Sequence, residues 1–289
     1  MHHRNTNPAV CLGERRGDRY TLRVWPPHGA LTSDQAEMLG RVARDCGEGE
    51  IRLTMHGALE VTGVAATDLP AATLELSVAG LAAATSSTDP TQVTACSGAE
   101  SCPNAVADAA RLAMQLERQL AQARPSGGLH VAVSACPNGC SMPRLADVGF
   151  AGAVMPKPLG GPAGGEADGA FACPDGAVVW EEGRPLWLVE RCGFCGRCVD
   201  RCETGGWGIA RLGYMAYVGG SLGRRPRLGL PLAEFLSEDE AVQMAYGIAS
   251  LMAEMGRPGE PLWALIERVG LDCLRKRVGQ TDPHGEEGV

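Results

Sequence analysis

Residues 94–110 read TACSGAESCPNAVADAA, and residues 131–153 read VAVSACPNGCSMPRLADVGFAGA. Each stretch places a pair of cysteines where an extended apolar run breaks, with spacings C-x5-C and C-x3-C; the four are Cys96, Cys102, Cys136 and Cys140. A [4Fe–4S] cluster needs one thiolate for each iron, so the two loops together supply a complete ligand set. A shared cluster would force both loops to one place in the fold.

Zinc binding and simple burial are the alternatives for these four thiols. Structural zinc sites usually repeat a shorter C-x2–4-C spacing, so the C-x5-C pair argues mildly against zinc. Prolines and glycines in both loops allow backbone amides to approach the sulfur atoms, and such amides raise the reduction potential of a cluster. The sequence therefore favours a cluster over zinc or inert thiols.

A second group of cysteines has the order C-x2-C-x2-C-x3-C, formed by Cys192, Cys195, Cys198 and Cys202. This run is typical of bacterial ferredoxins, in which the fourth cysteine can bind a different cluster. Cys173 precedes a proline, as a fourth ferredoxin cysteine commonly does, whereas Glu203 follows Cys202. We predict a second [4Fe–4S] cluster on Cys173, Cys192, Cys195 and Cys198. Cys202 is the alternative fourth ligand.

Residues 19–64 have the pattern of a ferredoxin-like α+β half-domain. Tyr20 to Trp25 alternates like a strand, and Thr32 to Gln35 fits a capping box that opens a helix. Gly47 ends that helix, and Ile51 to Met55 and Leu59 to Val64 alternate like paired strands.

The rest of the chain alternates short strands and helices. The sequence predicts a helix over 103–122 opened by Pro103, a helix capped at Ser237 that runs to Met255, and a last helix from Pro261 to about Val278. The Gly/Pro-rich residues 158–169 read as a linker, after which AVVW and PLWLVE can form a hairpin. We expect four segments: a half-domain (1–84), a first core part (85–168), an inserted ferredoxin module (169–209) and a second core part (210–289).

Composition sets limits on the class of protein. The net charge of −8 argues against a general nucleic-acid-binding surface. No apolar run approaches the roughly 18 residues that a membrane span needs, and the N-terminus carries no secretory pattern, so we predict a cytoplasmic protein without a membrane partner. Twelve cysteines in a reducing compartment favour metal ligands over disulfides. Cys11, Cys46 and Cys273 are expected to be buried thiols.

The two cysteine loops with their flanks resemble the siroheme–[4Fe–4S] signature of the sulfite and nitrite reductase family. IRLTMHGALEVTGV at 51–64 resembles the half-domain of that family, and MAYVGGSLGRRPRLG at 215–229 its later glycine-rich segment. The resemblance implies that Cys140 also bridges to the siroheme iron. The carboxylates of siroheme need basic partners, preferably arginines. The candidates are Arg52, Arg144, Arg224, Arg225 and Arg227.

The chain departs from the family pattern around the substrate. Gly128 and His130 stand where the family has a K-x-K pattern, and His56 stands in its T-x-R-Q pattern. Imidazole can bind an anion when charged and can donate protons near neutral pH. We therefore take His56, His130 and Lys157 as candidate catalytic residues, in an anion cage with fewer basic groups.

The function that the resemblance implies is a small siroheme- and [4Fe–4S]-dependent reductase. Electrons from an external donor, a ferredoxin or a flavin/iron–sulfur reductase subunit, would pass through the ferredoxin cluster and reduce sulfite to sulfide or nitrite to ammonia. With one half-domain and one core, a homo- or hetero-oligomer could complete the active site. The alternatives are a tetrapyrrole-modifying enzyme resembling precorrin-3B synthase and a non-catalytic electron-transfer subunit.

Overall fold

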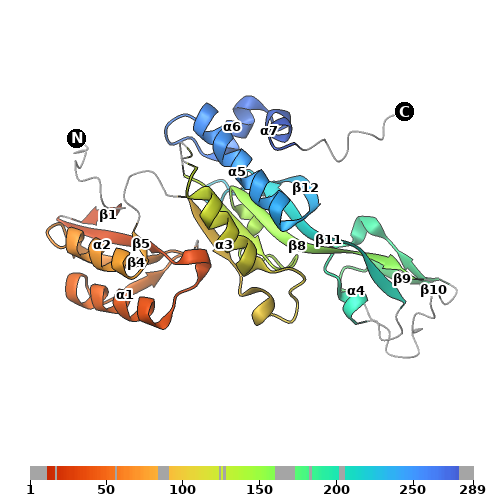
Figure 1. The fold of residues 1–289 in the computed structure, drawn as a ribbon, viewed down its shortest axis with the longest axis horizontal. Coiled ribbons are helices and arrows are strands. Elements are labelled where there is room, and N and C mark those ends of the chain that lie inside the picture. Colours follow the sequence, from red (N-terminus) through yellow and green to blue (C-terminus); the bar gives the residue numbers. More distant parts are fainter. Residues whose placement is uncertain are drawn as a thin grey trace.

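The structure is a computed structural model that describes residues 12–16, 18–55, 57–83, 91–123, 125, 128–159, 173–181, 184–201 and 206–279. Three residues of the sequence-based predictions, Cys11, His56 and Cys202, lie outside this set, as do residues 160–169 of the Gly/Pro-rich segment. Figure 1 shows three parts in a row: an N-terminal α+β unit, a central sheet with its helices, and a small cysteine-rich part.

The N-terminal unit is an antiparallel sheet covered by two helices. Its strands follow the order β1-β2-β4-β3, with β5 also paired to β2. The elements are β1 (Leu12–Arg16), β2 (Arg19–Trp25), α1 (Ser33–Cys46), β3 (Ile51–Leu53), β4 (Leu59–Ala65), α2 (Leu69–Val78) and β5 (Ala82–Ala83). The predicted capping box is present, because Thr32 Oγ1 accepts from the amide of Gln35 and the Gln35 side chain accepts from the amide of Thr32. Alternate residues of β2 and β4 form a separate apolar core with the helices.

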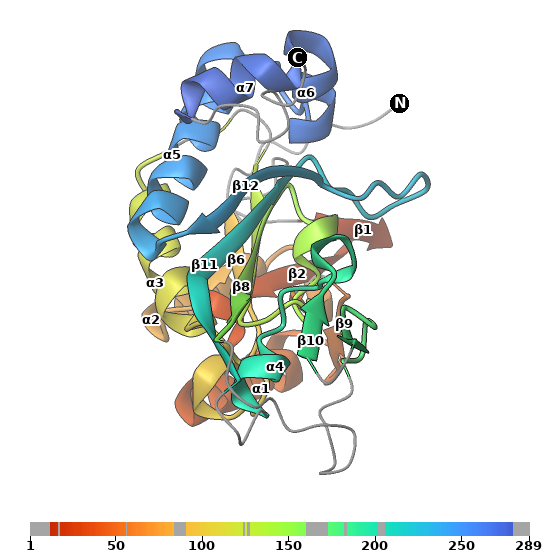
Figure 2. The ribbon, with the colours of Figure 1, turned by 90° about the vertical axis from the view of Figure 1, so that its right-hand side faces the viewer.

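The central sheet has the order β12-β11-β8-β7-β6. Its strands are β6 (Gln92–Ala95), β7 (His130–Ser134), β8 (Val148–Pro158), β11 (Trp207–Val218) and β12 (Leu230–Leu236). β6, β7 and β8 run parallel, and β11 and β12 are antiparallel to their neighbours. In Figure 2 the helices α3 (Ala109–Leu120) and α5 (Glu238–Met255) lie on one side of this sheet, and α6 (Leu262–Val269) and α7 (Leu271–Arg277) lie near one end of α5.

The cysteine-rich part is carried on an arm formed by β8 and β11. These two strands pair along their whole length, from Val148 opposite Val218 to Pro158 opposite Trp207. The part beyond the arm contains β9 (Val178–Glu181), β10 (Arg184–Trp187) and α4 (Arg197–Asp200). The predicted hairpin is confirmed, since β9 and β10 pair antiparallel. Short 3-10 turns complete the fold: η1 (Pro27–Gly29), η2 (Gly98–Glu100), η3 (Pro143–Leu145) and η5 (Val189–Arg191).

The helix predicted from Pro103 begins six residues later, at Ala109. The amides of Val106 and Ala107 both donate to Ala135 O, at 2.9 and 3.1 Å. Those amides are therefore used in a contact with another loop and cannot open a helix here. Asp108 caps the observed helix, because its carboxylate accepts from the amide of Arg111 at 3.0 Å.

The last predicted helix is two helices, α6 and α7, separated at Gly270. Gly270 has a φ of 88°, a conformation open to glycine and costly for other residues. The chain turns there, and the apolar faces of both short helices reach the central core: Leu262, Leu265, Ile266 and Leu274 are buried. The helix from the Ser237 capping box to Met255 is confirmed.

Replacing Leu116 in α3 by alanine should lower the free energy of unfolding by about 2–5 kcal/mol, because its side chain is fully buried and the substitution leaves a cavity. Leu74 in α2 is 65% exposed, so Leu74→Ala should change that free energy by no more than about 0.5 kcal/mol. Denaturant titration of both variants beside the parent protein measures the difference. Equal losses from the two substitutions would contradict this assignment of the core.

Candidate metal centre

The parallel pairing of β6 and β7 brings Cys96 and Cys136 together. Ala95 lies opposite Val133, and the amide of Cys96, directly after β6, donates to Val133 O at 3.1 Å. Cys136 follows β7 by two residues. The amide of Ala135 donates to Cys96 Sγ at 3.2 Å, so one loop already solvates a sulfur of the other. Such an amide stabilises added negative charge on the sulfur.

The other two cysteines of this group are held by tight turns. The amide of Cys102 donates to Gly98 O at 3.1 Å, and that of Gly139 donates to Cys136 O at 3.3 Å. Gly139 has a φ of 66°, which suits glycine in the turn between Cys136 and Cys140. Cys136 is buried, whereas Cys140 is exposed. Cys140 is thus the exposed member of this group, and Cys96 and Cys102 are half-buried.

The pKa of the Cys136 thiol depends on the other three cysteines of this group. Burial raises the pKa of the Cys136 thiol, and the nearby charges of Cys102, Cys140 and Cys96 raise that pKa further. The four groups therefore interact, as the ligands of one cluster must. Thiolates are the ligating form, so binding of iron here releases protons. Among the described residues, no three Cys, His, Asp or Glu side chains converge closely enough to hold a single metal ion.

A buried serine supports the Cys140 loop. The Ser134 hydroxyl, at the end of β7, lies 2.6 Å from the Ser141 hydroxyl and accepts from the amide of Ser141 at 3.2 Å. Ser134 is only 1% exposed, so both bonds act away from water. The sequence analysis did not single out Ser134. The signal was present, since a hydroxyl ends an otherwise apolar strand immediately before the cysteine pair.

A cavity of about 540 Å³ adjoins the loop that carries Cys140. The residues that line it and matter here are Asn138, Gly139, Met142, Arg144, Phe194 and Tyr217. Arg144 lies over the ring of Tyr217, with its guanidinium carbon 5.3 Å from the ring centroid. The cavity is large and largely apolar, and its lining includes one basic side chain, Arg144. This combination suits a flat aromatic cofactor with acidic substituents.

Of the arginines predicted to bind the cofactor, Arg144 alone lines this cavity. Arg52 lies on the edge strand β3 and pairs with Glu50 at 3.5 Å. Arg224 and Arg225 are exposed in the hairpin closed by Ser221 and Arg227. Arg227 pairs with Glu267 and stacks on Trp263, with 4.4 Å between its guanidinium carbon and the ring centroid.

The structure does not bring together the two candidate catalytic residues that it describes, His130 and Lys157. His130 begins β7, six positions before Cys136, which is about 20 Å at ~3.3 Å per residue. Its amide donates to Asp147 at 2.9 Å, its Nε2 lies 3.1 Å from the Thr94 hydroxyl, and it lines a second cavity, of about 470 Å³. Lys157 is exposed near the end of β8, beside the cysteine-rich part. A role for either residue in catalysis stays a prediction, as does one for His56.

The second cysteine group meets around one small cavity. Its lining includes all four predicted ligands, Cys173, Cys192, Cys195 and Cys198. Burial, together with the charges of Cys192 and Cys195, raises the pKa of the Cys198 thiol to about 12. The amide of Phe194 donates to Cys192 Sγ at 3.4 Å. This convergence supports Cys173 as the fourth ligand; Cys202 lies outside the described residues.

Phe194 anchors the second cysteine group to the central sheet. Its carbonyl accepts from the amide of Val154 in β8 at 2.8 Å, and its ring packs edge to face on Phe235, with centroids 5.3 Å apart. Phe194 has a φ of 55°, an uncommon conformation for a residue with a side chain. The strain is offset by these contacts. No local sequence pattern indicates this role, because Phe235 follows forty-one positions later.

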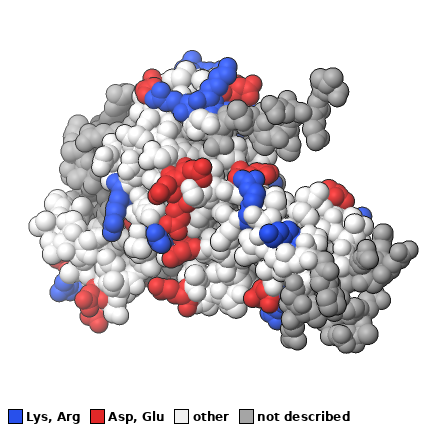
Figure 3. All heavy atoms as spheres, turned by 45° about the vertical axis from the view of Figure 1, so that its right-hand side comes forward, with Lys and Arg blue, Asp and Glu red and all other residues white. Residues whose placement is uncertain are grey.

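Charge on the surface is mixed. On the face drawn in Figure 3, the described acidic and basic side chains are interspersed between wide uncharged areas. Within the described residues, no helix is both long enough and apolar enough to span a bilayer.

Two family descriptions match the chain. "Nitrite/Sulfite reductase ferredoxin-like half domain" matches residues 13–78, and "Nitrite and sulphite reductase 4Fe-4S domain" matches residues 86–285. The first match covers the N-terminal α+β unit, and the second covers the central sheet together with both cysteine groups. The predicted α+β fold with a ferredoxin-like half-domain is therefore confirmed.

Curated proteins of similar sequence include reductases. A coenzyme F420-dependent sulfite reductase of Methanocaldococcus jannaschii is 26% identical over 93% of this chain and 42% of its own length. A ferredoxin–nitrite reductase of Synechococcus elongatus is 30% identical over 62% of this chain and 31% of its own length. The chain thus spans less than half of either curated relative.

A solved structure shows the same fold. The crystal structure of dissimilatory sulfite reductase I superposes with a TM-score of 0.72, covering 94% of this chain and 72% of that chain. The sequence identity is 21%, so this likeness concerns the fold.

Replacing Gly152 in β8 by alanine should disrupt the first cysteine group. A Cβ at Gly152 would lie 2.5 Å from Ala135 O and 2.8 Å from the Ala107 Cβ, so the loops of both cysteine pairs would have to move. We expect the reconstituted variant to lose about four iron atoms per chain, measured by iron and sulfide analysis. Gly223→Ala, where nothing lies within 4 Å of the new Cβ, is the matched control. Full iron content in Gly152→Ala would refute this role.

Proposed function

The chain belongs to the nitrite and sulphite reductase family, and on that premise we propose that it is a siroheme- and [4Fe–4S]-dependent reductase of a small oxyanion, either sulfite or nitrite. The observation that carries the proposal is the arrangement at Cys140. This thiol is the exposed member of a four-cysteine group, and its loop lines the 540 Å³ cavity.

The residues of this site fit the proposed cofactors. Cys96, Cys102, Cys136 and Cys140 would hold the cluster, with Cys140 also facing the siroheme iron. Met142, Met215 and Tyr217 would pack against the ring, and Arg144 would bind a ring carboxylate. When bound, siroheme supplies the iron centre at which an oxyanion is bound and reduced.

We further propose that Cys173, Cys192, Cys195 and Cys198 hold a second [4Fe–4S] cluster in an inserted module, residues 169–209. The β8–β11 arm carries this module, and Phe194 ties it to β8. Cys192 also lines the 540 Å³ cavity, so the module borders the proposed cofactor site. An external one-electron donor, a ferredoxin or a flavin/iron–sulfur subunit, would deliver electrons to the module.

The position of His130 supports an active site completed by another chain. His130 and Cys136 lie at opposite ends of β7, so one small substrate cannot touch both within one chain. In an oligomer, His130 and Lys157 would serve sites to which other chains contribute.

One observation favours a second candidate, a non-catalytic electron-transfer subunit. Arg144 is the single basic side chain among the described residues that line the 540 Å³ cavity. A reductase of small anions needs positive charge near its substrate. The two candidates differ in whether the isolated chain holds siroheme and reduces an oxyanion.

The test is the visible absorption spectrum of anaerobically purified protein, followed by acid–acetone extraction of the pigment. The reductase proposal expects siroheme bands, an extractable tetrapyrrole and reduction of sulfite or nitrite with an artificial donor. Cys140→Ser should lose the siroheme-linked activity by at least about 100-fold. Protein reconstituted with siroheme that shows iron–sulfur absorbance but binds no tetrapyrrole would overturn the proposal in favour of the electron-transfer subunit.

Iron content distinguishes the two possible fourth ligands of the second cluster. Cys173→Ser should lower the iron content by up to about four atoms per chain, because Cys173 shares a cavity with the other three thiols. Cys202→Ser should leave it at the level of the parent protein. The reverse pattern would assign Cys202 as the ligand.

A further inference from the structure

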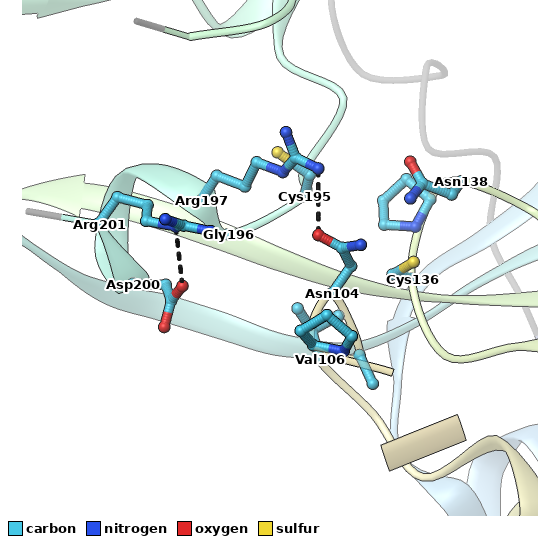
Figure 4. A pocket seen from close by; sticks show the side chains of 12 residues that line it. Asn104, Val106, Cys136, Asn138, Cys195, Gly196, Arg197, Asp200 and Arg201 are labelled. Carbon is cyan, nitrogen blue, oxygen red and sulfur yellow. Dashed lines mark hydrogen bonds and ion pairs between the residues drawn. The ribbon is translucent and has the colours of Figure 1, made fainter. Parts of the chain in front are cut away.

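The two cysteine groups are joined by a side-chain hydrogen bond. Arg197 Nη2 donates to Asn104 Oδ1 at 3.0 Å, although the residues are 93 positions apart. Arg197 lies between Cys195 and Cys198, and Asn104 lies two residues after Cys102. Figure 4 shows this bond bridging the gap between the loop that carries Cys195 and the loop that carries Asn104. Each partner is thus within two positions along the chain of a cysteine of its own group.

A small cavity lies beneath this bond. It has a volume of about 120 Å³, and its lining includes one cysteine from each group, Cys136 and Cys195. Asn104 and Arg197 belong to the same lining, and their side chains point toward one another (Figure 4). Two cysteines that line one small cavity would hold their clusters close together.

The backbone at Gly196 packs closely against side chains of β8 and of the first cysteine loop. Gly196 has a φ of 72°, and a Cβ there would lie 3.1 Å from the Val154 Cβ and 3.5 Å from the Val106 Cγ1. Val106 belongs to the first cysteine loop, and its amide donates to Ala135 O at 2.9 Å, next to Cys136. The contact between the loops is therefore both apolar, at Gly196, and polar, at Arg197. The polar contact lies at the surface, since Arg197 is exposed.

Arginine has two properties that matter at this place. Its planar guanidinium can donate to Asn104 in a fixed direction, which a flexible lysine ammonium does less well. It also stays charged at every physiological pH, and a permanent positive charge favours the form of a neighbouring cluster that has gained an electron. Exposure to solvent weakens this effect without changing its sign.

Resting on the proposed two-cluster function, we infer that Arg197 and Asn104 are positioning residues that set the spacing between the clusters and favour the reduced second cluster. Each transfer across this contact would move one electron, so that the second cluster would be oxidised and the first reduced, with no atom exchanged. The external donor then restores the electron to the second cluster. The role of both residues is positional, because neither binds iron.

The test compares the full chain, reconstituted anaerobically and reduced with dithionite, with Arg197→Gln, Asn104→Ala and Arg201→Gln. Arg201 is the matched control: it lines the same cavity, but its ion-pair partner is Asp200, at 3.6 Å. Iron content, the EPR splitting between the reduced clusters, and the midpoint potential of each cluster are measured. These readouts do not depend on turnover of substrate.

Arg197→Gln should keep the full iron content, lose the EPR splitting of the parent protein and lower the midpoint potential of the second cluster. Asn104→Ala should lose the splitting with a smaller change in potential, because the charge remains. Arg201→Gln should keep the EPR splitting of the parent protein, because Arg201 pairs with Asp200 and makes no contact with Asn104 that would hold the two loops together. If Arg197→Gln loses iron, the EPR splitting of Asn104→Ala alone decides whether this contact sets the spacing between the clusters.

Two outcomes would overturn the inference, and they are distinguishable. A parent protein with about eight iron atoms per chain, and unchanged splitting and potentials in both variants, would remove the role of Arg197 and Asn104 while leaving two clusters. A parent protein with about four iron atoms would remove the second cluster itself, and with it both the proposal and this inference.

Discussion

The parallel pairing of β6 with β7 is the constraint on which the candidate site depends. The hydrogen bond from the Cys96 amide to Val133 O continues the ladder past the end of β6. It places the chain after both strands at one edge of the sheet, where four thiols collect. The amides of Val106 and Ala107 then bind Ala135 O, so the loop carrying Cys102 follows the same geometry. A shift of one residue in this register would turn the side chains of β6 to the wrong face.

A second constraint couples the cysteine-rich part to that site. β8 pairs with β7 on one side and with β11 on the other, so the strand next to the first cysteine group also forms the arm that carries the second. Glycines make the approach close: Gly152 lies against Ala135, and Gly196 against Val154 and Val106. Close contacts at these glycines, together with the Arg197–Asn104 hydrogen bond, therefore set the geometry between the two groups.

Local rules predicted much of the fold. The capping boxes at Thr32 and Ser237 and the β9–β10 hairpin are where the pattern placed them, because each depends on residues within a few positions. The helix expected from Pro103 fails for a different reason. Proline is compatible with the first turn of a helix but does not require one. Here the amides of Val106 and Ala107 donate to the carbonyl of Ala135, which is about 30 residues away. Such long-range demands override local preference.

The sequence by itself determined the chemistry of the ligands. The spacings around Cys96, Cys136 and Cys192 predict thiolate sets for iron–sulfur clusters, because ligand spacing is a local property of the chain. Only the tertiary structure decided which groups meet. It places Arg144 beside the cavity at the Cys140 loop, His130 at the far end of β7, and Arg197 against Asn104. Those relations depend on strand register and on close contacts at glycines, and neither is encoded in the spacing of any one motif.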